Sequence, residues 1–251
     1  MKTYILYILG ALLLFSCDSR TEAEKLIDQS IMAHGGKKFE SAKISFDFRD
    51  RSYQIFKSPT GFEYIRAFSD STGQVKDVLN NEGFTRFVNG NAVELDEKRE
   101  RAFTNSVNSV AYFAYLPYGL NDPAVFKTYI GSSEIDGNNY DVIKVTFAEE
   151  GGGEDFDDEF LYWINQENHL IDYLAYSYHT DGGGVRFRKA INRHEIGGLI
   201  LQDYENYKPS DKSAKLEEME ALYKSGKLEL LSEILLENVL VEYIYDWKSI
   251  D

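Results

Sequence analysis

Arginines within strand-like segments are the side chains of this chain best suited to bind an anion. A guanidinium can hold a carboxylate or phosphate through two parallel hydrogen bonds. Five arginines interrupt alternating apolar and polar residues: Arg49, Arg66, Arg86, Arg186 and Arg188. Arg66 and Arg86 share the parity of apolar neighbours, so both would line a concave sheet face if that parity points inward. The alternative is that the arginines point outward and form ion pairs with Asp47, Asp77 and Asp172. The candidate ligands for a polar head group are Arg66, Arg86, Arg186 and Arg188.

Aromatic side chains with polar tips form a second candidate group. Each joins an apolar ring to a hydrogen-bonding atom, so it can fill a core, line a cavity, stack on a sugar or hold a lipid head. The sequence leaves these roles open for Tyr112, Phe113, Tyr115, Tyr162, Trp163, Tyr173, Tyr176 and Tyr178. From this group we select Tyr112, Trp163 and Tyr176 as candidate ligand-binding residues.

The four histidines show no metal-binding spacing, and the segment that starts at His194 is not an HExxH site. His34, next to two glycines, fits a helix C-terminus. His179 is a further candidate ligand-binding residue. A hydrolase that uses an Asp or Glu with His179 is one alternative function, but no Gly-x-Ser-x-Gly nucleophile elbow is present to partner it. We predict no catalytic residue and a non-enzymatic protein.

An acidic loop from Glu149 to Glu159 offers hard oxygen ligands of the kind that calcium prefers. The metal-ligand candidates are Asp155, Asp157 and Asp158. The loop lacks the EF-hand order of ligands, so a solvated acidic turn is the alternative to a cation site. The glycine-rich stretches lack the Lys-Ser/Thr of a P-loop, and no cofactor is predicted.

The N-terminus has the features of an export signal. Lys2 supplies the positive charge and Tyr4 to Phe15 the apolar run, which is shorter than the about 20 residues of a transmembrane helix. Leu14-Phe15-Ser16-Cys17 resembles a bacterial lipobox, which implies a signal peptide over residues 1–16 and a Cys17 that carries acyl chains such as palmitate. Residues 17–20 would form a short tether to the membrane of the cell envelope. We favour the outer membrane as the place of the lipid anchor. The acidic Asp18, directly after Cys17, keeps the inner membrane as an alternative.

Charge and cysteine content exclude several classes of function. The formal charge is −15, and loss of Lys2 with the leader leaves −16, from 26 basic against 42 acidic residues. Such a surface repels nucleic acid and anionic bilayers, so membrane attachment must come from acyl chains. Cys17 is the only cysteine, so its lipidation would leave no thiol for a disulfide or a zinc site.

Hydrophobic periodicity predicts a single, mainly β domain over residues 21–251. Thr21-x-x-Glu24 predicts a capping box for a helix that ends near Ala33, and Asp96 predicts the cap of a second helix that ends before Pro117. Five short strands between the helices and six after the second one are separated by turns. A third short helix lies near Leu216 to Tyr223, and a strand-like segment follows from Ile234 to Tyr245. A sheet of that many strands curls. We therefore predict an α+β fold with one curved antiparallel sheet, an incomplete, half-open β-barrel with covering helices.

Several motifs resemble an uncharacterised family of exported lipoproteins of diderm bacteria, the DUF6503-like family. They are Ala33-His34-Gly35-Gly36, Phe46-Asp47-Phe48-Arg49, residues 108–117, residues 119–125, Gly151-Gly152-Gly153, Tyr162-Trp163 and residues 183–188. The element order resembles the half-barrel of lipoprotein carriers and receptors, the LolA/LolB-like fold. That resemblance implies a protein that binds an acyl chain or another apolar ligand. The alternative from another class is an interaction lipoprotein whose loops at 121–123 and 151–158 meet an envelope protein partner.

Overall fold

The computed structural model describes residues 19–150, 156–179 and 182–244. The predicted signal peptide, Cys17 and the metal-ligand candidate Asp155 lie outside the described residues. Within the described part, no helix is both long and apolar enough to span a bilayer.

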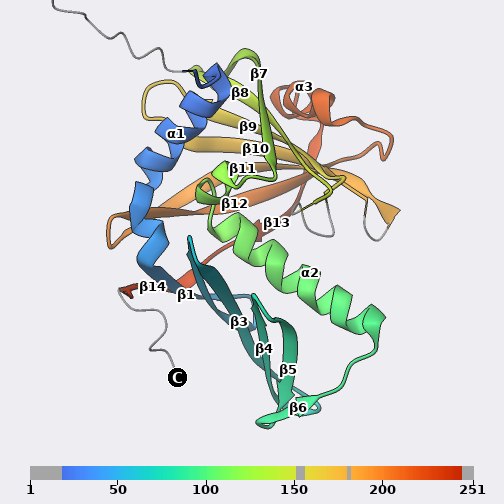
Figure 1. Ribbon diagram of the computed structural model, residues 1–251. Helices are drawn as coiled ribbons and strands as arrows, with labels where there is room; N and C mark the ends of the chain where they lie inside the picture. Colours follow the sequence, from blue (N-terminus) through green and yellow to red (C-terminus); the bar gives the residue numbers. More distant parts are fainter. Residues whose placement is uncertain (1–18, 151–155, 180–181, 245–251) are drawn as a thin grey trace, which may run out of the picture.

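Two seven-stranded antiparallel sheets form the body of the molecule (Figure 1). Sheet A has the order β14-β1-β2-β3-β4-β5-β6, with the strands β14 (Glu237–Tyr243), β1 (Ala42–Phe48), β2 (Arg51–Ser58), β3 (Gly61–Asp70), β4 (Gly73–Asn80), β5 (Gly83–Val88) and β6 (Asn91–Val93). Sheet B has the order β13-β12-β11-β10-β9-β8-β7, with the strands β13 (Leu228–Ile234), β12 (Leu199–Pro209), β11 (Gly184–Ile196), β10 (Ile171–Tyr178), β9 (Glu159–Asn165), β8 (Asn138–Phe147) and β7 (Val125–Ile135).

Three α-helices cover these sheets: α1 (Glu22–His34), α2 (Glu97–Ala114) and α3 (Met219–Lys224). Short 3-10 helices η1 (Gly36–Ser41), η2 (Tyr118–Asn121) and η4 (Leu216–Glu218) connect the elements. In Figure 1, α2 runs diagonally between the two sheets, α1 lies at one side of sheet B, and α3 lies at its far end.

The predicted helix starts are confirmed at atomic detail. The Thr21 side chain accepts from the Glu24 backbone, and Glu24 Oε2 accepts from the Thr21 N–H at 2.7 Å, which completes the capping box. The helix ends at Gly35, whose φ of 133° and close approach to Leu199 exclude a side chain, since an added Cβ would lie 2.6 Å from Leu199 Cδ2. In α2 the Asp96 side chain accepts from the Arg99 N–H at 3.0 Å.

The mainly β, half-open architecture with covering helices is confirmed, but the prediction of one continuous sheet is wrong. The two sheets separate between β13 and β14, which follow one another in the chain. β13 pairs with β12 of sheet B, whereas β14 pairs with β1 of sheet A. At the break, the N–H of Leu236 donates to Asp203 Oδ1 at 2.8 Å, and the Leu236 side chain is buried. Because this N–H is satisfied by a carboxylate, the ladder stops and the chain changes sheet.

Three hydrophobic clusters hold the layers together. One joins α2 to sheet A, and its members include Ile44, Ile55 and Val107. A second joins α1 and the loop after α2 to the inner face of sheet B, with Ile27, Leu120 and Tyr162 at its centre. The third lies on the outer face of sheet B under α3, around Trp163. Sheet B therefore buries both faces, which explains the nearly continuous apolar sequence of β9.

Candidate ligand-binding cleft

A cleft of about 550 Å³ lies between α2 and the inner face of sheet B. Its α2 side is made by Lys98, Arg101, Ala102, Asn105, Ser106, Asn108, Ser109, Tyr112 and Phe113. Its sheet side is made by Phe147, Asp158, Phe160, Tyr176, Tyr178 and Arg186. Ligand pockets in proteins have volumes of about 300–1,000 Å³, so the cleft is large enough for a small amphipathic molecule.

The two faces of α2 explain why the cleft forms. Val107, Ala111 and Ala114 fall on one helical face and are buried against sheet A. The next face carries small and polar residues, including Asn105 and Ser109, which leave space in front of sheet B. A helix that packs on one sheet while presenting short side chains to the other keeps the two layers apart.

Stacked aromatic rings make the wall of the cleft. The Phe160 ring stacks on Tyr176 with centroids 5.4 Å apart, and Tyr112 lies 5.4 Å from Phe160. The Tyr112 hydroxyl lies 2.6 Å from the Tyr162 hydroxyl. Burial raises the pKa of both Tyr112 and Tyr162 well above the ordinary value for tyrosine, so both phenols are neutral at physiological pH. The wall therefore offers apolar ring faces and no negative charge.

A smaller pocket of about 180 Å³, here called the inner pocket, shares lining residues with the cleft. Ser109 and Phe113 line both spaces. The other residues of the inner pocket are Phe48, Arg49, Val110, Ala114, Arg188, Gln202, Tyr204, Asn206, Ile234 and Leu236. One half of this lining is apolar and the other half polar.

Arg188 is the buried cation of the inner pocket, whose lining also includes the exposed Arg49. Arg188 is 7% exposed, and its guanidinium lies 3.7 Å from the centroid of the Phe113 ring. The Nη2 atom of Arg188 donates to the Tyr176 hydroxyl at 3.0 Å. Among the described residues, no carboxylate forms an ion pair with Arg188. The two rings contact the guanidinium without neutralising it, so it remains a nearly buried positive charge.

Arg186 lies at the mouth of the cleft. Its Nη2 donates to the Tyr178 hydroxyl at 2.6 Å, and its guanidinium lies 5.0 Å from the centroid of the Tyr178 ring. The carboxylate of Asp158 also reaches this rim, where His179 Nδ1 lies 3.7 Å from Asp158 Oδ1. The His179 side chain is 69% exposed, so it flanks the cleft and does not line it.

Arg66 and Arg86 lie outside the cleft and hold α2 on sheet A. The buried Asp77 carboxylate accepts from Arg66 Nη2 at 2.6 Å and from Arg86 Nε at 2.6 Å. Arg66 Nη1 donates to Ser106 of α2 at 2.7 Å, and Arg86 lies 3.5 Å from the centroid of the Phe103 ring. Arg66 and Arg86 therefore face inward, as the first alternative predicted. They also form ion pairs with Asp77, as the second alternative predicted.

Trp163 points to the opposite face of sheet B. It alternates with Tyr162 along β9 and is buried beneath α3, where its Nε1 donates to Glu220 Oε2 at 2.9 Å. The structure therefore separates Trp163 from Tyr112 and Tyr176, which share the cleft. A period of two along a strand that is buried on both faces does not indicate which face meets a ligand.

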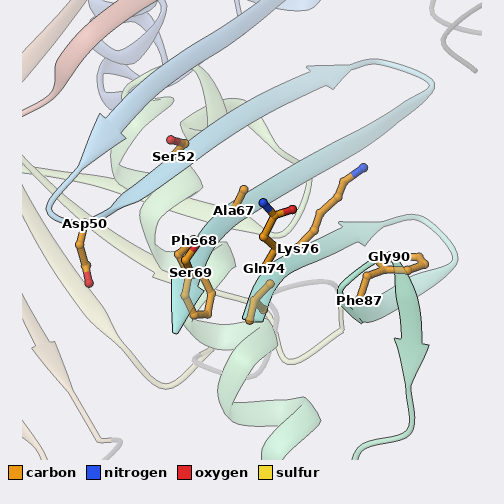
Figure 2. Close-up of a pocket in the computed structure, with 10 residues that line it drawn as sticks. Asp50, Ser52, Ala67, Phe68, Ser69, Gln74, Lys76, Phe87 and Gly90 are labelled. Atoms are coloured by element: carbon orange, nitrogen blue, oxygen red, sulfur yellow. The ribbon is translucent and has the colours of Figure 1, made fainter. Parts of the chain in front are cut away.

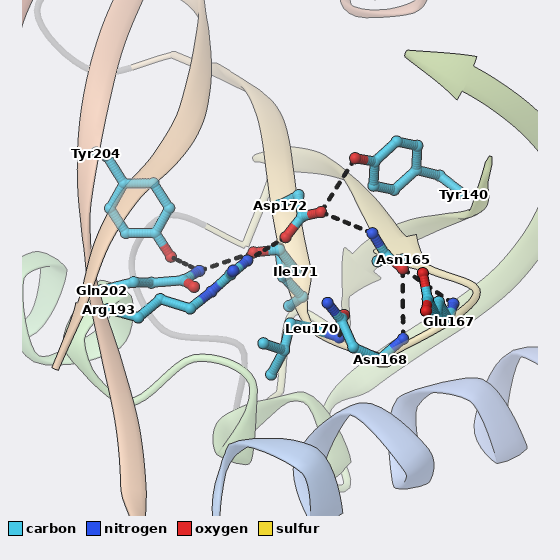
Figure 3. A network of polar contacts seen from close by, with 10 residues as sticks. All are labelled: Tyr140, Asn165, Glu167, Asn168, Leu170, Ile171, Asp172, Arg193, Gln202 and Tyr204. Atoms are coloured by element: carbon cyan, nitrogen blue, oxygen red, sulfur yellow. Dashed lines mark hydrogen bonds and ion pairs between the residues drawn. The ribbon is translucent and has the colours of Figure 1, made fainter. Parts of the chain in front are cut away.

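A polar network at one end of sheet B fixes Gln202 (Figure 3). Gln202 Nε2 donates to the Ile171 carbonyl and to the Tyr204 hydroxyl, both at 2.9 Å. The neighbouring Asp172 accepts from Arg193 and, at 3.0 Å, from Asn165 Nδ2. With its Nε2 held in this way, Gln202 keeps a fixed side chain at the inner pocket.

A groove of about 830 Å³ lies on sheet A and is larger than the cleft (Figure 2). Its lining comes only from β2 to β5 and their turns, and includes Ser52, Ala67, Lys76 and Phe87. These paired residues alternate with Arg66 and Asp77, so they lie on the face of sheet A that points away from α2. None of the candidate residues lines this groove, so we place the site in the cleft.

Metal binding finds no support in the described residues, where no group of three His, Cys, Asp or Glu side chains is arranged to hold an ion. Asp157 and Asp158 are described, whereas Asp155 is not.

Several lining residues escaped the sequence analysis as ligand candidates, among them Phe160 in the cleft and Gln202 and Asn206 in the inner pocket. The polar residues Gln202, Tyr204 and Asn206 occupy every second position of β12. Their side chains therefore form one polar row on a single face of the strand. That row was a usable signal, but only the tertiary structure shows that it lines the inner pocket together with Arg188.

Comparisons with known proteins agree with this fold. A family model described as a family of unknown function (DUF6503) matches residues 2–238. A crystal structure of a LolA superfamily protein from Nitrosomonas europaea is similar with 12% identity, a TM-score of 0.51, and coverage of 90% of this chain and 95% of that chain. At this identity the likeness shows a shared LolA-like fold.

Two further solved structures align less well. A DUF1329 family protein from Desulfovibrio piger has 10% identity and a TM-score of 0.36, with 76% of this chain and 88% of that chain covered. The Mycobacterium tuberculosis lipoprotein LppX has 14% identity and a TM-score of 0.28, with 63% and 88% covered. No curated protein shows significant similarity to this chain.

Proposed function

This chain belongs to the DUF6503 family, and we propose that it is a lipid-anchored protein of the cell envelope that binds a hydrophobic or amphipathic ligand, such as a lipid, in the cleft without changing it chemically. The observation that carries the proposal is the cleft of about 550 Å³ with its wall of stacked aromatic rings. The LolA-like fold supports it as an analogy with lipoprotein carriers.

The composition of the cleft fits binding better than catalysis. Its sheet side is mostly aromatic, and its titratable groups are spread along the rim. His179, the candidate for acid–base chemistry, is 69% exposed, and its nearest described carboxylate is 3.7 Å away. Removing an alkyl chain from water is worth about 0.8 kcal/mol for each buried CH₂ group, so an aromatic cleft can bind a ligand without any reaction.

The N-terminal sequence supplies the cellular part of the proposal. Acylation of Cys17 attaches the protein to a membrane of the envelope, and residues 17–20 connect the anchor to the domain that begins at residue 21. In α1, which follows at Glu22, the first turn is capped by Thr21, so the folded domain starts within a few residues of the anchor. The start of the folded domain is thereby held close to the membrane surface.

Blocking the cleft tests the proposal. Purified protein lacking residues 1–17 is titrated with the neutral fluorophore N-phenyl-1-naphthylamine, whose emission rises in apolar surroundings. We expect saturable binding, and we expect Ser109→Trp to abolish it, because Ser109 lines both the cleft and the inner pocket. Glu100→Trp is the matched control, since Glu100 lies on α2 and lines neither space.

Two results would contradict the proposal: no saturable binding by the wild-type protein, or equal binding by the Ser109→Trp variant. Native mass spectrometry of the same protein, followed by solvent extraction, identifies a ligand that is retained through purification.

A further inference from the structure

We infer that the inner pocket holds the anionic head group of the ligand, with Arg188 as the residue that binds it. This inference rests on the proposed function, because the alkyl part of the ligand is assigned to the aromatic cleft. It adds the chemical class of the head: a group with acidic oxygens, such as a phosphate or carboxylate, that also carries a hydrogen-bond donor.

The first argument is the state of the Arg188 guanidinium. More than nine-tenths of this residue is buried, its Nε is buried without a hydrogen-bond acceptor, and no carboxylate of the described residues pairs with it. Arg66, the other buried arginine named above, instead has two of its nitrogens on Asp77. A buried cation is stable when an anion or strong acceptor meets it, so Arg188 is poised to bind an anion from outside the chain.

The second argument is a pair of acceptors on β12, the strand that pairs with the strand of Arg188. Gln202 and Asn206 are each 8% exposed, and Gln202 Oε1 and Asn206 Oδ1 are buried without a donor. Both residues line the same pocket as Arg188. Buried side-chain oxygens are normally hydrogen-bonded, so a head group that presents hydroxyl or amine donors beside its acidic oxygens would satisfy all three residues.

The third argument is the distribution of charge. The whole chain is strongly acidic, with a formal charge of −15, and would repel an anion at long range. The cleft and inner pocket are locally different, because among the described residues their lining includes the cations Lys98, Arg101, Arg49, Arg186 and Arg188 and one carboxylate, that of Asp158. This local excess of cations gives an anionic head a favourable path from the mouth of the cleft to Arg188.

The sizes of the two spaces match this division. The inner pocket has about 180 Å³, which is below the usual range for a whole ligand but suits a head group. The adjoining cleft has about 550 Å³ and aromatic walls, which suit an alkyl chain. Phe113 lies at their junction, with its ring under the Arg188 guanidinium.

A matched series of ligands tests the inference. Dodecyl phosphate, dodecanoate and dodecanol share one chain and differ only in the head, and each is used to displace N-phenyl-1-naphthylamine from the wild-type protein. We expect the two anions to bind at least about tenfold more tightly than the alcohol, as one charge-assisted hydrogen-bond pair would give. Inorganic phosphate alone should leave the probe bound, because the affinity also needs the chain.

Variants at Arg188 supply the decisive comparison. In Arg188→Gln the two anions should bind about as tightly as dodecanol, and the affinity for dodecanol should stay the same. In Arg188→Lys part of the preference for the anions should remain, because the positive charge is kept. Arg99→Gln is the control for loss of one positive charge, since Arg99 is a highly exposed residue of α2 outside both spaces. Circular dichroism confirms that each variant is folded, and Gln202→Leu is a second variant that probes the same pocket.

The outcomes separate the two proposals. Probe binding without any preference for anions, or an equal loss of all three ligands in Arg188→Gln, would overturn the head-group inference and leave the apolar cleft intact. Displacement by inorganic phosphate alone would assign the pocket to a free anion and overturn the lipid-head inference. Failure of the probe and of every dodecyl ligand to bind would overturn the proposed function and this inference with it.

Discussion

The guanidinium of Arg188 lies 3.7 Å from the centroid of the Phe113 ring, so the helix α2 and the strand β11 meet through a cation–π contact at the junction of two pockets. Such contacts contribute about 0.5–2 kcal/mol, and more when water is excluded. Phe113 and Arg188 line the inner pocket together with Gln202 and Asn206.

Replacing Phe113 with Leu keeps an apolar side chain but removes the ring face. We expect the free energy of unfolding to fall by about 1 kcal/mol in urea denaturation. In an Arg188→Gln background the same change should cost less, and the difference between the two costs measures the contact itself. Phe126→Leu serves as control, because Phe126 is 57% exposed on β7. An equal cost of Phe113→Leu in both backgrounds would show that the contact does not stabilise the fold.

Removing the Asp77 carboxylate should be the most destabilising single change among the ion pairs. The Asp77 side chain is 0% exposed and binds both Arg66 and Arg86, so Asp77→Ala leaves two guanidiniums without their shared anion. We expect a loss of about 3–5 kcal/mol in the free energy of unfolding, measured by urea denaturation. Glu97→Ala removes an exposed partner of Arg101 and should produce no measurable change. Near-wild-type stability of Asp77→Ala would contradict the buried role of this pair.

The buried His34 predicts how stability depends on pH. Burial lowers the pKa of His34 from 6.5 to about 4, and the hydrogen bond between Nδ1 and the Ser30 carbonyl offsets this only in part. Between these two pKa values the unfolded chain binds more protons than the folded one. The contribution of His34 is therefore complete above pH 6.5 and is lost as the pH falls toward 4, by about 3 kcal/mol.

The measurement is the free energy of unfolding between pH 4 and pH 7. In His34→Gln the part of the slope that belongs to this histidine should disappear. His179→Gln is the control for the loss of an exposed histidine, since the His179 side chain is 69% exposed. If His34→Gln retained the full slope, protonation of other groups would be its source.

Acylation of Cys17 predicts membrane attachment. Cells that express Cys17→Ser should release the protein from the membrane fraction and should not incorporate a palmitate analogue into it, because the acceptor thiol is absent. Ser19→Ala, two residues away, is the matched control and should remain in the membrane fraction. Membrane retention of Cys17→Ser would mean that the N-terminal segment is not processed as a lipoprotein leader.

Local patterns in the sequence were sufficient to predict most elements of the fold. The capping residues Thr21 and Asp96 act on backbone groups within one helical turn, so both helix starts could be read directly. Alternation with explicit turns likewise predicted β1 to β5 and β7 to β12. These features depend on neighbours in the chain, which the sequence displays.

The end of the chain was harder to predict. The sequence favoured one strand-like segment from Ile234 to Tyr245, whereas the structure has β13 (Leu228–Ile234) and β14 (Glu237–Tyr243) in different sheets. The change of sheet depends on the contact of the Leu236 N–H with Asp203, which is 33 residues away in the chain. No periodicity in the segment itself reports such a contact.

The sequence by itself determined the residue types, the strand and helix positions and the arginine-rich, aromatic character of the candidate site. The tertiary structure decided which of the buried arginines lacks an anionic partner. Arg66, Arg86 and Arg188 look alike along the chain, but β4 places Asp77 between the first two, whereas Phe113 of α2 and Tyr176 of β10 meet the third. Because a buried charge is governed by whatever side chains the fold brings to it, its pairing is a property of the packed layers and not of any one segment.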